Sequence, residues 1–233
     1  MKLPHFAASG VELADTEHLL EGLPALQRLA LTYCPRLVTK PTLALFALDT
    51  RLASLLRNSS EPMLAQLRLA WWRETLDCDA SQWPEGEPLL GILRSWRGEQ
   101  QALVSLVDGW EALCAEPPLQ QSAIEVLATA RGTAFAALAR LADVPQASET
   151  ALRLGRAWAL ADIASKLTDP GEKGQAIALI ETQDWRRVGL SRKLRPLAVL
   201  HGLAARSVKR GEDIGQAGPF ALATAIRLGL LGR

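Results

Sequence analysis

The sequence predicts an all-α protein, and three observations support this fold class. Helix-forming residues, above all Leu and Ala, outnumber β-branched residues along most of the 233-residue chain. Apolar residues recur at spacings of three and four, which is the period of a helix with a buried face. Pro and Gly separate these segments, and no segment has a convincing strand pattern. Because 48% of the residues are hydrophobic, we expect one domain, residues 1–233, with a sizeable core.

The first predicted helices lie before residue 58. Residues 13–33 carry leucines at helical spacing, with a kink or boundary at Pro24. The next helix is expected to begin with Thr39 as its cap and Pro41 in its first turn. It ends near Arg57, where "NSSEP" interrupts the apolar pattern. These signals predict two or three consecutive helices with short connections.

A third segment carries two adjacent tryptophans. The "NSSEP" stretch offers a capping serine and Pro62 for a first turn, and the helix then runs to about Asp77. Trp71 and Trp72 are neighbours, so they point about 100° apart on a helix. Leucines accompany each tryptophan on its own face. We therefore expect both tryptophans to be buried, with this helix lying between neighbouring helices.

The remaining helices follow turn-rich breaks such as "CDASQWPEGEP", "DVPQAS" and "TDPGEKGQ". Ser148 is the expected cap of one of them. The predicted ranges are 88–96, 99–115, 119–141, 149–167, a short helix at 176–182, 195–210, and a last apolar segment, 219–233. The complete domain is expected to contain about eight to ten helices.

Charge and cysteine content limit the function classes. A formal net charge of +1 does not favour binding to nucleic acid. Three scattered cysteines make a disulfide framework or a zinc site improbable and favour a reducing compartment. We expect no signal peptide and no transmembrane helix. The predicted location is the cytoplasm, with peripheral contact at the inner membrane as an option, because residues 185–195 are locally basic.

Common catalytic motifs are absent. The sequence contains no GxSxG, GxxxxGK[ST], GxGxxG or HExxH pattern. Acidic residues do occur at helical spacing, and Asp162 and Asp169 would share a face if their helix continued that far. Such acidic spacing is common on solvated helix faces, so it does not by itself indicate a metal site.

Several segments resemble the squalene/phytoene synthase family. The resemblance begins with "KPTLALFALDTRLASLLRNSSEPMLAQLRLAWWRETLD", which is similar to the first motif helix of that family and its tryptophan helix. It continues with "ARGTAFAALARLADVP", "LGRAWALADIASKLTDPGE" and "RPLAVLHGLAARSVKR". The segments follow the order of the family along residues 25–230. The resemblance implies an isoprenoid synthase-like helical bundle around a central apolar cavity.

The resemblance also implies a chemistry. The family joins prenyl diphosphates head to head, and aspartates on two facing helices hold the Mg²⁺ ions that bind the diphosphates. Carboxylates one turn apart can share such a hard cation. The metal then neutralises the departing diphosphate.

The chain departs from the family at those aspartates. The positions that match them are Ala53, Ser54, Arg57, Lys166 and Pro170. Arg57 and Lys166 reverse the charge, and a cation about 4 Å from a metal costs on the order of 4 kcal/mol per unit charge pair. Pro170 suggests that the second motif helix ends early. We therefore expect no catalytic residues, no bound metal and no cofactor.

The leading interpretation is a non-catalytic member of this fold. It would bind a lipid or prenyl ligand, or act as an assembly or interaction factor. The resemblance is greatest to the branch that assists assembly of respiratory complex I, which makes a protein partner conceivable. Arg57 and Lys166 would form a cationic mouth that holds an anionic head group without metal.

Two alternatives remain open. One is an active Mg²⁺-dependent prenyltransferase that uses displaced acids, namely Asp49, Asp162 and Asp169. The other is an interaction protein whose cavity is filled by side chains, recognised by an exposed apolar patch. Composition does not separate these interpretations, although the two charge reversals count against the enzyme.

Overall fold

The described part of the protein is helical throughout, as the sequence predicts. The computed structural model describes residues 10–58, 61–186, 188–212, 224–225 and 227–229, and these contain no strand. The α-helices are α1 Gly10–Glu21, α2 Ala25–Leu31, α3 Arg36–Arg57, α4 Pro62–Asp77, α5 Pro88–Leu93, α6 Gln100–Glu111, α7 Gln121–Leu141, α8 Ser148–Ala164, α9 Pro170–Glu181 and α10 Arg195–Arg210.

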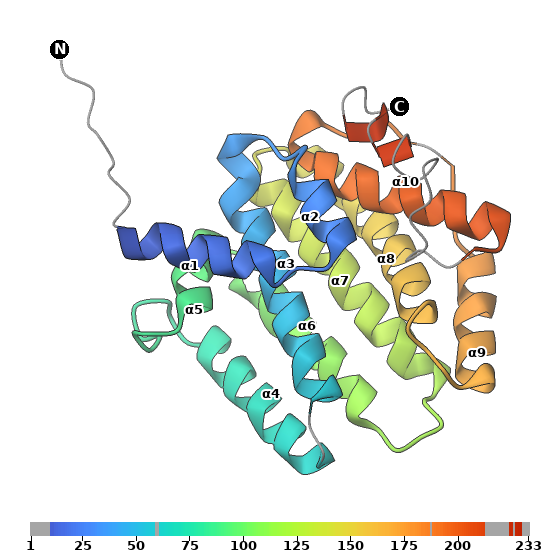
Figure 1. The fold of residues 1–233 in the computed structure, drawn as a ribbon, viewed down its shortest axis with the longest axis horizontal. Coiled ribbons are helices and arrows are strands. Elements are labelled where there is room, and N and C mark those ends of the chain that lie inside the picture. Colours follow the sequence, from blue (N-terminus) through green and yellow to red (C-terminus); the bar gives the residue numbers. More distant parts are fainter. Residues whose placement is uncertain (1–9, 59–60, 187, 213–223, 226, 230–233) are drawn as a thin grey trace.

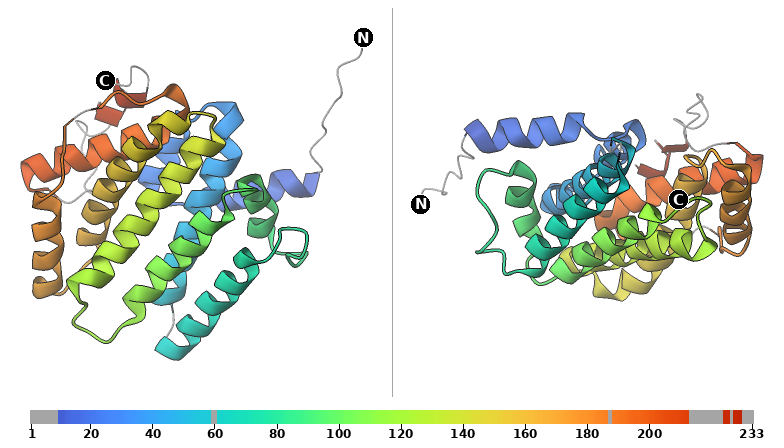
Figure 2. Two further views of the ribbon diagram at one scale, coloured as in Figure 1. Left: turned by 180° about the vertical axis from the view of Figure 1, so that it is seen from behind. Right: turned by 90° about the horizontal axis from the view of Figure 1, so that it is seen from below.

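The helices form two layers. Helices α4, α6, α7, α8 and α9 lie side by side in this order, which Figure 2 shows from behind. The second layer contains α1, α2, α3 and α10 and covers the other side (Figure 1). Helix α7 has its most extensive packing with α8 and then with α6. These three helices therefore form the frame on which the candidate site is built.

Three glycines let this frame pack closely. A Cβ atom on Gly132 of α7 would lie 2.6 Å from the carbonyl oxygen of Leu152 on α8. A Cβ atom on Gly109 of α6 would lie 2.8 Å from Cβ of Ala130 on α7. Gly155 on α8 is equally close to α7. Larger side chains at these positions would force the helices apart, so the glycines fix the spacing of α6, α7 and α8.

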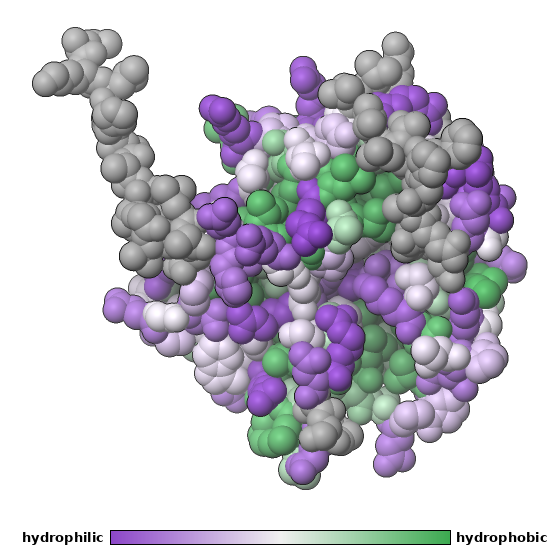
Figure 3. Space-filling view, in the orientation of Figure 1, coloured by the Kyte–Doolittle hydropathy of each residue, from purple (hydrophilic) through white to green (hydrophobic). Residues whose placement is uncertain are grey.

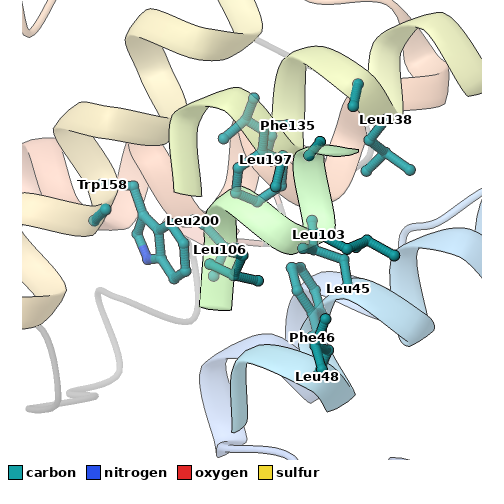
Figure 4. Close-up of a cluster of buried hydrophobic side chains, with 14 of the residues drawn as sticks. Leu45, Phe46, Leu48, Leu103, Leu106, Phe135, Leu138, Trp158, Leu197 and Leu200 are labelled. Atoms are coloured by element: carbon teal, nitrogen blue, oxygen red, sulfur yellow. The ribbon is translucent and has the colours of Figure 1, made fainter. Parts of the chain in front are cut away.

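Large apolar side chains fill the space between the two layers. Figure 4 shows Phe46 of α3 and Phe135 of α7 within one cluster, which also includes Trp158 of α8. The rings of Phe135 and Trp158 meet edge to face, with centroids 5.7 Å apart. Other labelled members come from α3, α6, α7 and α10: Leu45, Leu48, Leu103, Leu106, Leu138, Leu197 and Leu200. This cluster ties the core of the two layers together.

The predicted start of α3 was wrong. The helix begins at Arg36, not near Thr39, and Pro41 lies inside it. The Thr39 hydroxyl donates to the carbonyl oxygen of Pro35 and does not cap the helix. The buried indole Nε1 of Trp96 donates to the Pro41 carbonyl oxygen at 2.9 Å. Tertiary packing around Pro41 therefore overrides the local start signal.

Two further sequence expectations need correction. Trp72 is buried, but Trp71 is 42% exposed, because α4 is an edge helix whose second face has no neighbour among the described residues. Ser148 does not cap α8, since its hydroxyl makes no hydrogen bond within the described structure.

Most of the last predicted segment, 219–233, lies outside the described residues. None of the helices that are described combines the length and apolarity that a bilayer span requires.

Helix α10 buries a histidine that responds to pH. His201 stacks on Trp185 with ring centroids 5.5 Å apart, and its Nε2 atom has no hydrogen-bond partner among the described residues. Burial lowers the pKa of His201 from 6.5 to about 4, and Arg153 contributes further while Asp184 opposes the shift. The unfolded chain therefore protonates this histidine more readily than the folded protein does. The contribution of neutral His201 to stability is fully present above pH 6.5 and is lost as the pH falls towards 4.

The pH dependence can be measured. Between pH 7.5 and pH 5, this histidine is expected to remove about 2 kcal/mol from the free energy of unfolding. Urea unfolding of the wild type and of His201→Leu at both pH values would measure the contribution. The variant should lose less stability on acidification by roughly that amount, and an identical loss in both proteins would refute the assignment.

Candidate functional site

A buried arginine links Asp49 and Asp162, two of the three acids that the sequence singled out. Arg131 of α7 donates from Nε and Nη2 to the two carboxylate oxygens of Asp49 on α3, at 2.9 and 2.8 Å. Its Nη1 donates to Asp162 Oδ2 on α8 at 2.8 Å. The Arg131 side chain is only 3% exposed, and that of Asp49 only 6%. One guanidinium therefore bridges two carboxylates inside the protein.

Two tryptophans complete the surroundings of Arg131. Its guanidinium carbon lies 5.1 Å from the ring centroid of Trp110 and 5.2 Å from that of Trp158. These distances fall within the range of cation–π attraction, which gains strength in a desolvated site. The Trp110 Nε1 atom also donates to Asp49 Oδ1 at 2.9 Å. Asp49 therefore accepts three hydrogen bonds, and the network around it is well satisfied.

Burial and charge act in opposite directions on these groups. Desolvation alone would lower the pKa of Arg131, but the charges of Asp49 and Asp162 outweigh it and raise that pKa. Desolvation would likewise raise the pKa of Asp162, yet Arg131 and Lys166 lower it. Arg131 and Asp162 consequently both remain ionised at neutral pH, as a buried ion pair with good geometry requires.

Lys166 completes the charge balance of the cluster. Its Nζ lies 2.7 Å from Asp162 Oδ2, one helical turn away, and its side chain is 47% exposed. Asp49 and Asp162 supply two negative charges, and Arg131 and Lys166 supply two positive ones. We refer to these four residues as the Arg131 network. The network has no net charge, so its acids have no spare charge for a divalent cation.

The backbone explains how these residues meet. Trp158, Asp162 and Lys166 follow one another at intervals of four, which places them along one side of α8 and its end. Arg131 is adjacent to Gly132, at the close approach of α7 and α8. Trp110 is adjacent to Gly109, at the close approach of α6 and α7. The glycines thus bring three helices close enough for long side chains to reach Asp49.

The other predicted site residues lie around this network but are not part of it. Ala53 is buried on α3, and the Ser54 hydroxyl donates to the carbonyl oxygen of Arg51. Arg57 ends α3 and is exposed, with no ion pair to any described residue. The two predicted cations differ, because Lys166 pairs with Asp162 and Arg57 has no ion pair to a described residue.

The second predicted motif is divided between two helices. Helix α8 ends at Ala164, and Pro170 is the first residue of α9, in agreement with the expectation that the motif helix ends early. Asp169 caps α9 by accepting from the amide of Glu172 at 2.9 Å. The structure thus brings Asp49 and Asp162 together through Arg131, whereas Asp169 has a capping role elsewhere.

Figure 3 shows that the surface beside the network is hollowed. The hollow lies between the second half of α3 and the segment that joins α8 to α9, and its floor is apolar. Arg57, at the end of α3, and Lys166, just after α8, belong to the two elements that flank it. An apolar floor with cations on the flanking elements suits an amphipathic anion with a hydrocarbon chain.

Sequence reasoning missed Arg131, Trp110 and Trp158. One signal for Arg131 was present, since "LATARGTAFAALA" places a single charge within a run of small and apolar residues. A charge in a helix that is apolar on all sides must be paired when it is buried. The partners were not readable, because Asp49 lies 82 positions away and Asp162 lies 31 positions away.

Metal ligation and relationships complete the description of the site. Within the described residues, no group of three or more His, Cys, Asp or Glu side chains is arranged to hold a metal ion. Comparisons of the chain with protein-family models, curated proteins and solved structures find no match. The resemblance to squalene/phytoene synthases therefore rests on the segments quoted from the sequence.

Proposed function

We propose that this protein is a non-catalytic, squalene/phytoene synthase-like binding protein that holds a lipid or prenyl ligand without metal. One observation carries the proposal. Arg131 already neutralises Asp49 and Asp162, two of the three acids that the prenyltransferase alternative would use. An arginine keeps its proton in proteins, so this cation is permanent.

Electrostatics favours the binding protein over the prenyltransferase alternative. A Mg²⁺ ion about 4 Å from the Arg131 guanidinium would be repelled by about 8 kcal/mol at an effective dielectric constant of about 20. Metal binding would also have to break the hydrogen bonds that Asp49 and Asp162 accept from Arg131. Without a metal, a departing diphosphate would lack the divalent charge that neutralises it in the resembled family.

The proposed ligand is an amphipathic anion. Its hydrocarbon part would occupy the apolar hollow in Figure 3, and its head group would contact Arg57 and Lys166. Arg57 is exposed at the end of α3 and has no ion pair to a described residue. Lys166 has its remaining donors available, since an ammonium group offers three. Head-group binding would therefore be electrostatic and independent of divalent ions.

A binding titration with farnesyl diphosphate separates these functions. We expect the same affinity in EDTA and in Mg²⁺, no release of diphosphate, and at least tenfold weaker binding by Arg57→Ala/Lys166→Ala. A matched variant, Arg186→Ala/Arg210→Ala, also removes two exposed cations and should bind like the wild type. Chelator-sensitive binding, turnover, or unchanged affinity of the first double variant would contradict the proposal.

A second candidate function is that of an assembly or interaction factor, and α4 supports it. Met63, Leu64, Leu67 and Trp71 form an exposed apolar stripe along this edge helix, with Leu67 62% exposed. Contiguous apolar stripes of this kind mark interaction surfaces. A photo-crosslinking residue at Leu67 should capture a protein in cells, whereas the same residue at Ile177 on α9 should not. Equal labelling from both positions would count against an interface on α4.

A further inference from the structure

A second cationic pocket lies at the end of α3 opposite Arg57. It is formed where the turn between α2 and α3 meets the start of α10, and it has a volume of about 460 Å³. Thr32, Tyr33 and Leu37 line one side, while Arg192, Lys193 and Arg195 line the other. Since α3 has 22 residues, about 33 Å separate this pocket from Arg57. No acidic residue is among those that line it.

Arg195 is the unusual member of this pocket. The residue is 8% exposed, yet its guanidinium has no hydrogen bond or ion pair with any described residue. Burial, and then the charge of Arg192, lower the pKa of Arg195, and no acid opposes the shift. Arg131, the other buried arginine, has two carboxylate partners. Arg195 thus lines the pocket with no counter-charge from the described residues, and an anionic ligand in the pocket would supply one.

The backbone adds donors at the same place. Helix α3 begins at Arg36 after Pro35, and no side chain caps its first turn. This helix is long enough to have a positive N-terminal end with free amide groups. The start of α10 adds no such donor, because the Arg195 amide donates to the Arg192 carbonyl oxygen and Pro196 has no N–H. One helix start and the Arg195 guanidinium thus face the cavity, which Arg192 and Lys193 also line.

We propose that this pocket binds a phosphate group. The guanidinium of Arg195 suits bidentate contact with two phosphate oxygens, and a helix start suits the remaining charge. Arg192 adds an exposed cation. The Lys193 ammonium lies 3.9 Å from the exposed carboxylate of Asp143, and it can exchange this long contact for one with a phosphate. A soluble small molecule and a lipid head group present the same phosphate oxygens to the pocket. Either one is therefore a source of the bound phosphate. This site is separate from the ligand hollow of the proposed function.

Thermal unfolding in inorganic phosphate tests this site. Phosphate, compared with chloride at equal ionic strength, should raise the Tm of the wild type and of Arg57→Ala/Lys166→Ala equally. The Arg195→Gln variant should lose the response, which corresponds to at least tenfold weaker binding. Its Tm without phosphate should equal or exceed that of the wild type, because Arg195 has no ion pair with a described residue that the change would remove. Arg73→Gln, which alters a surface pair with Asp108 between α4 and α6, should respond like the wild type.

Vesicles identify the source of the phosphate. Phosphatidylcholine vesicles with 20% phosphatidic acid that bind the wild type but not Arg195→Gln would indicate a lipid head group. A response to inorganic phosphate without vesicle binding would indicate a soluble ligand. The proposal is overturned if phosphate does not stabilise the wild type beyond chloride. It is also overturned if Arg195→Gln responds as strongly as the wild type.

Discussion

Replacing Arg131 by methionine is expected to destabilise the protein by about 3–5 kcal/mol at pH 7.5, because removal of one partner leaves buried charge uncompensated. Asp49 would lose its bidentate contact, and Asp162 would retain only Lys166. The loss should be smaller at pH 5, where a buried carboxyl group without a cation can take up a proton. Urea unfolding at both pH values would measure the effect.

A surface pair provides the control for this variant. Arg140 forms a bidentate pair with Glu99, but its side chain is 42% exposed. The Arg140→Met variant should therefore lose less than about 1 kcal/mol. If Arg131→Met lost no more than this control, the Arg131 network would not stabilise the fold as described.

The Asp49→Asn variant is expected to lose about 3 kcal/mol of unfolding free energy, because the amide cannot balance the buried guanidinium charge. Asp162→Asn is the matched comparison. Its side chain is more exposed, at 15%, and Arg131 would still be paired with Asp49. The second variant should therefore lose less, about 1–2 kcal/mol.

The combination of variants separates a structural role from a catalytic one. Arg131→Met/Asp49→Asn should lose clearly less stability than the sum of the two single variants, because each single change leaves the other charge unpaired. In the prenyltransferase alternative, Asp49→Asn would abolish turnover and leave stability almost unchanged. A stable Asp49→Asn protein that has lost measurable turnover would thus support the enzyme.

The sequence predicted the fold class and the order of the helices, because both follow from local apolar periodicity. The start of α3 was wrong because Pro41 is accommodated by packing against Trp96, a contact across 55 positions. The exposure of Trp71 was missed for a related reason. Periodicity shows that a face is apolar, but it does not show whether a neighbour covers that face.

The candidate site was only partly accessible from the sequence. Asp49 and Asp162 were identified as acids on facing helices, and Lys166 as a cation nearby. The residue that joins them, Arg131, comes from a third helix, and its position depends on the close approach at Gly132. The structure thus adds a buried cation, Arg131, to the two that the sequence singled out, Arg57 and Lys166.

One measurement tests most directly the proposal that Arg131 takes the place of a metal ion. Thermal unfolding of the wild type would be followed in 10 mM MgCl₂, in NaCl of equal ionic strength and in EDTA. Arg131 already lies between Asp49 and Asp162 and balances their negative charge. We therefore expect the same Tm in all three solutions. A Tm that rises with Mg²⁺, falls again with EDTA and no longer responds in Asp49→Asn would contradict the proposal.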